Sequence, residues 1–203
     1  MSERYYLRDS RSNTGSNMMF WAAGGGYTTD LSRAEEFTRS KAFAQHECRE
    51  SDIPMPQALV DSHARLVVDM QHLRRERANA SGGELCYVQI EHCYDGNDVT
   101  WVSQVGRPTT DLSIARIWSA QDALCATMRN DGWRVWPKIF IDDLRRYAAQ
   151  AIHSKQIIQE AGIVLLNPNP PRKYVTRCAH CGRFLSDRQQ YDYCPNCGGE
   201  NRP

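Results

Sequence analysis

The residues Thr28-Thr29-Asp30-Leu31-Ser32 recur unchanged as Thr109-Thr110-Asp111-Leu112-Ser113, and these two segments set the register of an internal repeat. When the sequence is shifted by 81 residues, residues 6–65 align with residues 87–146 without a gap, and thirteen of the sixty positions are identical. Self-similarity at a fixed spacing is the signature of a repeated structural unit. The sequence therefore predicts two tandem copies of one small module. The other identical pairs are Tyr6 and Tyr87, Gly15 and Gly96, Gly25 and Gly106, Ala34 and Ala115, Ala42 and Ala123, Pro56 and Pro137, Asp61 and Asp142, and Arg65 and Arg146.

Each module is predicted to be a small ββα-type unit of the α+β class. In the first copy two strands form a hairpin, because Asn13 and Gly15 supply turn residues between them. Helices follow, on the spacing of the apolar residues. A unit of this size buries little core alone, so the two copies are expected to pack about a pseudo-twofold axis. The expected strands are 4–9, 17–23 and 36–38, then 86–92, 98–104 and 133–136; the expected helices are 31–35, 41–50 and 57–73, then 120–129 and 140–160.

The repeated Thr-Thr-Asp segment has two interpretations. Asp30 and Asp111 stand where an N-cap residue would accept a free backbone N–H at the start of a short helix. Threonine and aspartate side chains could also hydrogen-bond a ligand. The cap after a tight turn is the favoured interpretation, and a ligand site is the alternative.

The joints of the chain agree with this plan. Residues 74–84, RRERANASGGE, are polar and contain a glycine pair, which suits a linker. Residues 167–174 contain three prolines, which suits a stiff spacer that ends a preceding helix. The predicted organisation is a first module at 1–73, the linker, a second module at 85–166, the spacer and a final domain at 175–203.

The final domain carries four cysteines with the spacing of metal ligands. Cys178 and Cys181 form one Cys-x-x-Cys pair, and Cys194 and Cys197 form another after twelve intervening residues. Four thiolates match tetrahedral Zn²⁺ and leave no open position for water. The sequence predicts a zinc ribbon with one structural Zn²⁺ per chain. Iron in the same sulfur cage, which would make an electron carrier like a rubredoxin, is the alternative.

The role of the ribbon is open between two possibilities. Zinc could staple a tail that is too short to fold otherwise. Alternatively, the ribbon could bind nucleic acid, because arginine and tyrosine side chains stack on bases. Residues 172–203 hold six basic and three acidic residues, so with zinc and four thiolates the tail has a net charge of only about +1. The candidate nucleic-acid-binding residues are Arg177, Arg183, Arg188, Tyr191 and Tyr193.

The bulk composition places few constraints on function. The formal net charge is +1, so no strong field attracts the chain to nucleic acid or to acidic membranes. No apolar stretch approaches the ~20 residues that span a bilayer, and the first residues contain no signal-peptide pattern. We therefore expect a cytoplasmic protein without a membrane partner. The sequence contains no P-loop, GxGxxG, GxSxG or HExxH motif, so a non-enzymatic protein is predicted.

The segment from Tyr5 to Ala34, with YYLRDSRSN, FWA and GYTTDLSRA, resembles small and largely uncharacterised proteins of bacteriophages and prophages. The similarity covers most of residues 5–60 and extends more faintly to the second copy, which has Pro108 where the first has Tyr27. The resemblance implies a phage accessory protein in the cytoplasm of a host cell, and it transfers no catalytic residue.

Two functions follow as expectations. The leading one is a non-enzymatic protein that binds a host protein or protein complex, with inhibition of a bacterial defence system as one outcome by analogy. The alternative is a nucleic-acid-binding or transcription-related accessory protein that acts through its zinc ribbon. The identity of the target and the oligomeric state are left open.

Overall fold

The computed structural model describes residues 3–78, 84–166, 176–186 and 189–201. The chain divides into two compact units, Met1–Asn167 and Pro168–Pro203. The larger unit mixes helices and strands, as the sequence predicts. The predicted spacer at 167–174 and most of the glycine-containing part of the predicted linker lie outside the described residues.

The first sheet is built around the long strand β1, which pairs with three other strands. Its order is β3-β2-β1-β4, and β5 pairs with residues 5–9 of β1 along the opposite edge, all antiparallel. The hairpin of β1 and β2 is as predicted, although β1 continues five residues beyond the predicted end and contains an irregularity between Asp9 and Asn13. The elements are β1 (Arg4–Thr14), β2 (Asn17–Trp21), β3 (Tyr27–Thr28), the 3-10 helix η1 (Leu31–Arg33), β4 (Phe37–Thr38), α1 (Arg39–Cys48), β5 (Asp52–Pro56) and α2 (Gln57–Ser62).

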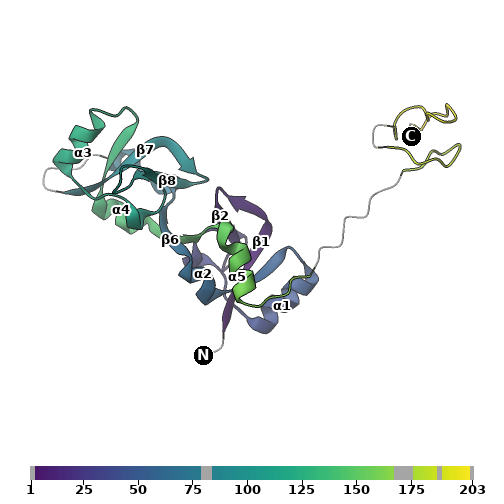
Figure 1. Ribbon diagram of the computed structural model, residues 1–203, viewed down its shortest axis with the longest axis horizontal. Helices are drawn as coiled ribbons and strands as arrows, with labels where there is room; N and C mark the ends of the chain where they lie inside the picture. Colours follow the sequence, from purple (N-terminus) through teal and green to yellow (C-terminus); the bar gives the residue numbers. More distant parts are fainter. Residues whose placement is uncertain (1–2, 79–83, 167–175, 187–188, 202–203) are drawn as a thin grey trace. The chain divides into compact units, whose positions relative to one another are not determined.

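The second sheet has the same plan. Its order is β10-β7-β8-β9, and β11 pairs with β7. Each of its strands begins 81 residues after its counterpart in the first sheet. Figure 1 shows α3 and α4 beside β7 and β8, and α1 and α2 near β1. The elements are β7 (Leu85–Asp95), β8 (Asp98–Val102), β9 (Pro108–Thr109), η4 (Leu112–Ile114), β10 (Trp118–Ser119), α3 (Ala120–Thr127), β11 (Trp133–Pro137) and α4 (Lys138–Leu144).

The two long helices predicted at 57–73 and 140–160 are wrong. Each begins as a short helix and then becomes a strand, β6 (Ala64–Val68) or β12 (Arg145–Ala149). These strands pair with each other antiparallel, with Leu66 opposite Tyr147 at the centre. The apolar spacing fits a helix locally, but the strand partner lies 81 residues away in the sequence, where a local pattern carries no information. The β-branched Val67 and Val68 also favour a strand.

The helix predicted at 31–35 is a single turn of 3-10 helix, η1. The remainder of each predicted long helix, after β6 or β12, contains only short helical segments. After β6 the chain forms η2 (Met70–His72) and η3 (Arg75–Arg77). After β12 it forms η5 (Ala151–His153) and α5 (Ser154–Glu160).

The halves exchange their terminal segments. We call residues 3–63 the first half, 64–78 the first arm, 84–144 the second half and 145–166 the second arm. Ala149 and Ile157 of the second arm are buried in the core of the first half with Met18 and Phe20. In Figure 1 helix α5 lies beside the purple and blue elements of that half. Reciprocally, the first arm buries Val68 and Ala78 in the core of the second half, with Leu66 and Leu73 packed against it.

The described residues of the smaller unit form almost no apolar core. Its buried cluster consists of Cys178, Cys194 and Leu185. Two isolated antiparallel bridges, Arg177 with Phe184 and Tyr193 with Glu200, hold its two loops. In the described part of the chain, no helix has the length and apolar character needed to cross a membrane.

Candidate functional site

The four cysteines of the predicted ribbon come together. Each Cys-x-x-Cys pair lies on a tight turn, closed by a backbone bond from Gly182 N–H to the Cys178 carbonyl (2.9 Å) or from Gly198 N–H to the Cys194 carbonyl (2.8 Å). The four Sγ atoms all lie within 4.8 Å of one another. Such a cluster could hold a metal ion.

The sulfur spacing fits a tetrahedral metal site. Sγ of Cys178 lies 3.7 Å from Sγ of Cys197, and Sγ of Cys181 lies 3.7 Å from Sγ of Cys194. Zn–S bonds of about 2.3 Å in a tetrahedron place sulfur atoms about 3.8 Å apart, whereas a disulfide requires about 2.05 Å. The donor set therefore fits one four-coordinate ion and no disulfide. Both zinc and iron accept four thiolates.

Hydrogen bonds prepare two of the thiols for deprotonation. The backbone N–H of Arg183 and the side chain of Asn196 lower the pKa of Cys181 to about 6. Backbone N–H groups of Cys197 and Asn196 lower the pKa of Cys194. For Cys197 the N–H of Gly199 acts in the same direction, but the crowding of the neighbouring thiols prevails and raises its pKa to about 12. A divalent cation would relieve this repulsion, because metal binding displaces the thiol protons.

The candidate nucleic-acid-binding residues are mostly at the surface of the ribbon. Tyr191 and Tyr193 are exposed. The guanidinium of Arg177 stacks over the Phe184 ring at 4.5 Å. Arg183 donates to Asn196 (3.3 Å), while Arg188 lies outside the described residues. Phe184, which is 59% exposed, was not among the predicted nucleic-acid-binding residues. Its position between the two cysteine pairs could have identified it as a candidate.

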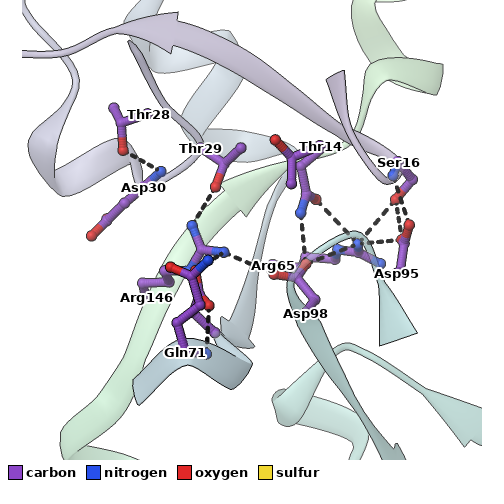
Figure 2. A network of polar contacts seen from close by, with 12 residues as sticks. Thr14, Ser16, Thr28, Thr29, Asp30, Arg65, Gln71, Asp95, Asp98 and Arg146 are labelled. Carbon is purple, nitrogen blue, oxygen red and sulfur yellow. Dashed lines mark hydrogen bonds and ion pairs between the residues drawn. The ribbon is translucent and has the colours of Figure 1, made fainter. Parts of the chain in front are cut away.

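A second group of polar residues lies where the two halves meet (Figure 2). There the two hairpin turns touch. A Cβ on Gly15 would lie 2.4 Å from the backbone N of Gly96, and one on Gly96 would lie 2.6 Å from the N of Gly15. Glycine is therefore required at both positions, and both copies of the repeat have it there. Asp95 accepts hydrogen bonds from the backbone N–H (2.7 Å) and the hydroxyl of Ser16, which ties one turn to the other.

Asp98 forms the centre of this polar network and is fully buried. Its carboxylate accepts from the Asn17 amide (2.6 Å) and from Arg146 (2.9 Å), and it lies 3.6 Å from Arg65. Arg65 also contacts Asp95 (3.3 Å). Asn17 and Asp98 are equivalent positions of the repeat, as are Arg65 and Arg146, so one acid serves two symmetry-related guanidinium groups.

Burial and hydrogen bonding act in opposite directions on the two acids. Burial raises the pKa of Asp98, although Asn17, Arg146 and Arg65 oppose the shift. At Asp95 burial also acts to raise the pKa, but the hydrogen bonds from Ser16 and Arg65 prevail and lower it. Ionised Asp98 therefore depends on its partners.

The Thr-Thr-Asp segments cap η1 and η4, which is the favoured interpretation of the sequence. Asp30 accepts from Ser32 N–H (3.0 Å), and Asp111 accepts from Ser113 N–H (2.9 Å). Thr29 connects this segment to the second arm, because its hydroxyl accepts a hydrogen bond from Arg146. That contact was not predicted, since it joins two residues 117 positions apart.

Comparison with known proteins finds no matching family, no matching characterised protein and no matching solved structure.

Proposed function

We propose that this chain is a non-enzymatic binding protein of the phage accessory type. In this proposal the chain contains two copies of one module, which together grip a host protein or protein complex in the host cytoplasm. The ribbon holds one structural Zn²⁺. Blocking a bacterial defence complex is the biological outcome that such binding would serve.

The exposed apolar side chains of the second half support this proposal. The repeat provides an internal comparison, because equivalent positions of the first half carry charges. Leu85 (54% exposed), Ile114 (52%) and Met128 (86%) replace Arg4, Arg33 and Glu47. Since both halves have the same strand order, the fold alone does not require apolar residues at these exposed positions. Large exposed apolar side chains mark contact sites for other proteins where they lie together, as Leu85 and Ile139 do at one cavity.

The surface at Leu85 is concave. Leu85 and Ile139, which is 73% exposed, line a cavity of about 430 Å³ together with Pro137 and Lys138. An apolar side chain of a bound protein would fit such a cavity, whose lining also includes Glu84 and the ion pair of Lys138 with Asp142.

The decisive experiment captures partners of the tagged chain from bacterial lysate with and without nuclease. A discrete protein that survives nuclease is expected, and its yield should fall in Leu85→Arg and Met128→Glu, which introduce the charges found in the first half. Val164→Glu is the matched control, because Val164 is equally exposed (89%) but lies in the second arm. Capture that is lost on nuclease treatment, or that falls equally in the control, would contradict the proposal.

Nucleic-acid contact through the ribbon is the second candidate. The exposed rings of Tyr191, Tyr193 and Phe184, beside Arg177, favour it. Single-stranded DNA or RNA binding should then weaken with salt, and Tyr193→Ala should reduce it by ~1–3 kcal/mol, the range for one stacked base. Salt-independent binding, or the same affinity after this substitution, would exclude stacking by Tyr193.

Structural zinc has its own test. Metal analysis of the purified chain should find one zinc per chain, and Cys194→Ser should release it while the larger unit keeps its unfolding transition. Iron with the charge-transfer absorption of an iron–thiolate centre would instead indicate the electron-carrier alternative.

A further inference from the structure

A polar cavity of about 250 Å³ lies beside the network of Figure 2, next to Thr28, Thr29 and Asp30. Four parts of the chain form it. The first half contributes the β2–β3 region and η1, and the first arm contributes Gln71 and His72. The second half contributes Asn97, and the second arm contributes Arg146. This cavity is distinct from the apolar surface of the second half.

The repeat shows which lining residues the fold needs. Thr28, Thr29, Asp30, His72 and Arg146 are identical to their equivalents 81 residues away, as expected for the framework of the joint. The remaining polar lining differs. Where the cavity has Tyr27, Arg33 and Gln71, the equivalent positions are Pro108, Ile114 and Ile152. At these three positions only the first copy has a polar side chain, which favours a ligand on that copy.

The charged groups that line the cavity differ in their partners. Oδ1 of Asp30 accepts hydrogen bonds from the N–H and hydroxyl of Ser32, which hold the carboxylate in place without neutralising its charge. Asp69 accepts from Gln71 N–H and lies 3.4 Å from Arg146, which also binds Asp98. Among the described residues, the guanidinium of Arg33 has no ion pair and no side-chain hydrogen bond, although Arg33 lines the cavity.

The Tyr27 side chain adds a fixed aromatic ring at the cavity. Its hydroxyl accepts from Arg11 (3.4 Å) and Arg49 (3.3 Å), and its ring meets Trp21 edge-on at 6.3 Å. The side chain is nevertheless 43% exposed, so part of the ring is open to a ligand. Both guanidinium groups at its hydroxyl are ion-paired, Arg11 with Asp9 (2.8 Å) and Arg49 with Asp52 (3.5 Å), so they hold the ring without adding net charge.

We propose that this cavity binds a small phosphorylated molecule with hydroxyl groups, which is the chemistry of a sugar phosphate or a mononucleotide. The phosphate is held by Arg33 with His72 beside it, because a guanidinium forms charge-assisted bonds with phosphate oxygens. Thr28 and Gln71 offer hydrogen bonds to hydroxyl groups, and a base would stack on Tyr27. The cavity volume lies below the usual pocket range of about 300–1,000 Å³. A single sugar phosphate or mononucleotide therefore fits, and an oligomer does not.

Calorimetric titration of the full-length protein with ribose 5-phosphate, AMP, ribose and inorganic phosphate tests this proposal. The two phosphate esters are expected to bind more tightly than ribose or phosphate. Arg33→Ile introduces the residue of the second half and should weaken both esters at least tenfold, the loss expected for a charged hydrogen bond. Arg129→Ile is the matched control, because it removes the same charge from an exposed position outside the cavity.

The two esters separate the possible sources. Tighter binding of AMP that disappears in Tyr27→Ala assigns a nucleotide, whereas equal binding of both esters assigns a sugar phosphate. Gln71→Ile, which also copies the second half, should weaken both esters less than Arg33→Ile. Absence of binding by either ester, or equal weakening in Arg33→Ile and Arg129→Ile, would overturn the proposal. It does not depend on the proposed host partner, whose capture can succeed or fail separately.

Discussion

The first and second halves share a strand order, and some of their side-chain contacts occur in both halves while others occur in only one. Tyr6 approaches Asp61, and Tyr87 approaches Asp142, each with a hydroxyl–carboxylate distance of 3.4 Å. Burial raises the pKa of both phenols to about 12. These identical residues make the same contact twice. Other positions differ between the halves, and one of them is a buried polar position of the joint.

That buried position is Asn17 in the first half and Asp98 in the second. With an acid at both, two carboxylates would face each other within hydrogen-bonding distance. With an amide at both, Arg65 and Arg146 would lose their shared buried counter-ion. The comparison teaches that two copies of one module cannot keep identical residues where equivalent positions meet, because an acid at both Asn17 and Asp98 would place two like charges in contact.

The largest effect should come from the contact between the turns. Gly96→Ala requires a positive φ of 62° at a residue with a side chain, and it also places a Cβ 2.6 Å from backbone atoms of the first half. Left-handed backbone costs ~1–2 kcal/mol and overpacking another ~1–3 kcal/mol, so a loss of up to ~5 kcal/mol is expected in urea unfolding.

Gly106→Ala is the matched control, since its φ is 76° and its Cβ would meet nothing. Its loss should stay at ~1–2 kcal/mol. Equal losses for the two substitutions would show that the halves do not depend on the contact between their turns.

Asp98→Asn should have the next largest effect. The free energy of unfolding is expected to fall by ~3 kcal/mol, the lower end for a broken buried pair, because Asp69 and Asp95 still face the two arginines. The double substitution Asn17→Asp with Asp98→Asn moves the acid to the equivalent position and should restore most of the loss. Thermal unfolding of the three proteins measures this. No recovery in the double variant would contradict the equivalence of the two sites.

Acid should destabilise the first half through Asp9, whose equivalent in the second half is Ile90. The hydrogen bonds from Arg11 hold the pKa of Asp9 below its usual value. The unfolded chain therefore binds the proton more readily, and stability is lost as the pH falls through about 4 and below. The urea midpoint should drop less between pH 6 and pH 3 in Asp9→Asn than in the wild type. Asp131→Asn, at an exposed site, should show the same drop in urea midpoint as the wild type.

The smallest effect should come from the two caps. Asp30→Ala and Asp111→Ala each remove one side-chain bond to the start of a 3-10 turn. A loss of ~1 kcal/mol is expected for each, and the two losses should agree within about 0.5 kcal/mol. Clearly unequal losses would show that the caps are not equivalent.

Local patterns in the sequence predicted the parts of this molecule that are built locally. The hairpins follow from Gly15 and Gly96, the caps follow from Asp30 and Asp111, and the cysteine cluster follows from two short spacings. Strands β6 and β12 were missed because each needs the other, and the contact of Arg146 with Thr29 was missed for the same reason. The offset of 81 marked Arg65 and Arg146 as a pair, but it did not show that they meet at one acid.

The exchange of arms has a consequence for synthesis on the ribosome. The core that contains Met18 and Phe20 is completed by Ala149, Ile157 and Leu165, about a hundred residues after the first half ends. At about 5–20 residues per second, the nascent chain carries an unfinished apolar core for roughly 5–20 s. The first half therefore cannot complete its fold before the second is synthesised. A ribosome that stalls between them leaves a fragment with exposed apolar surface, which chaperones must bind or proteases must degrade.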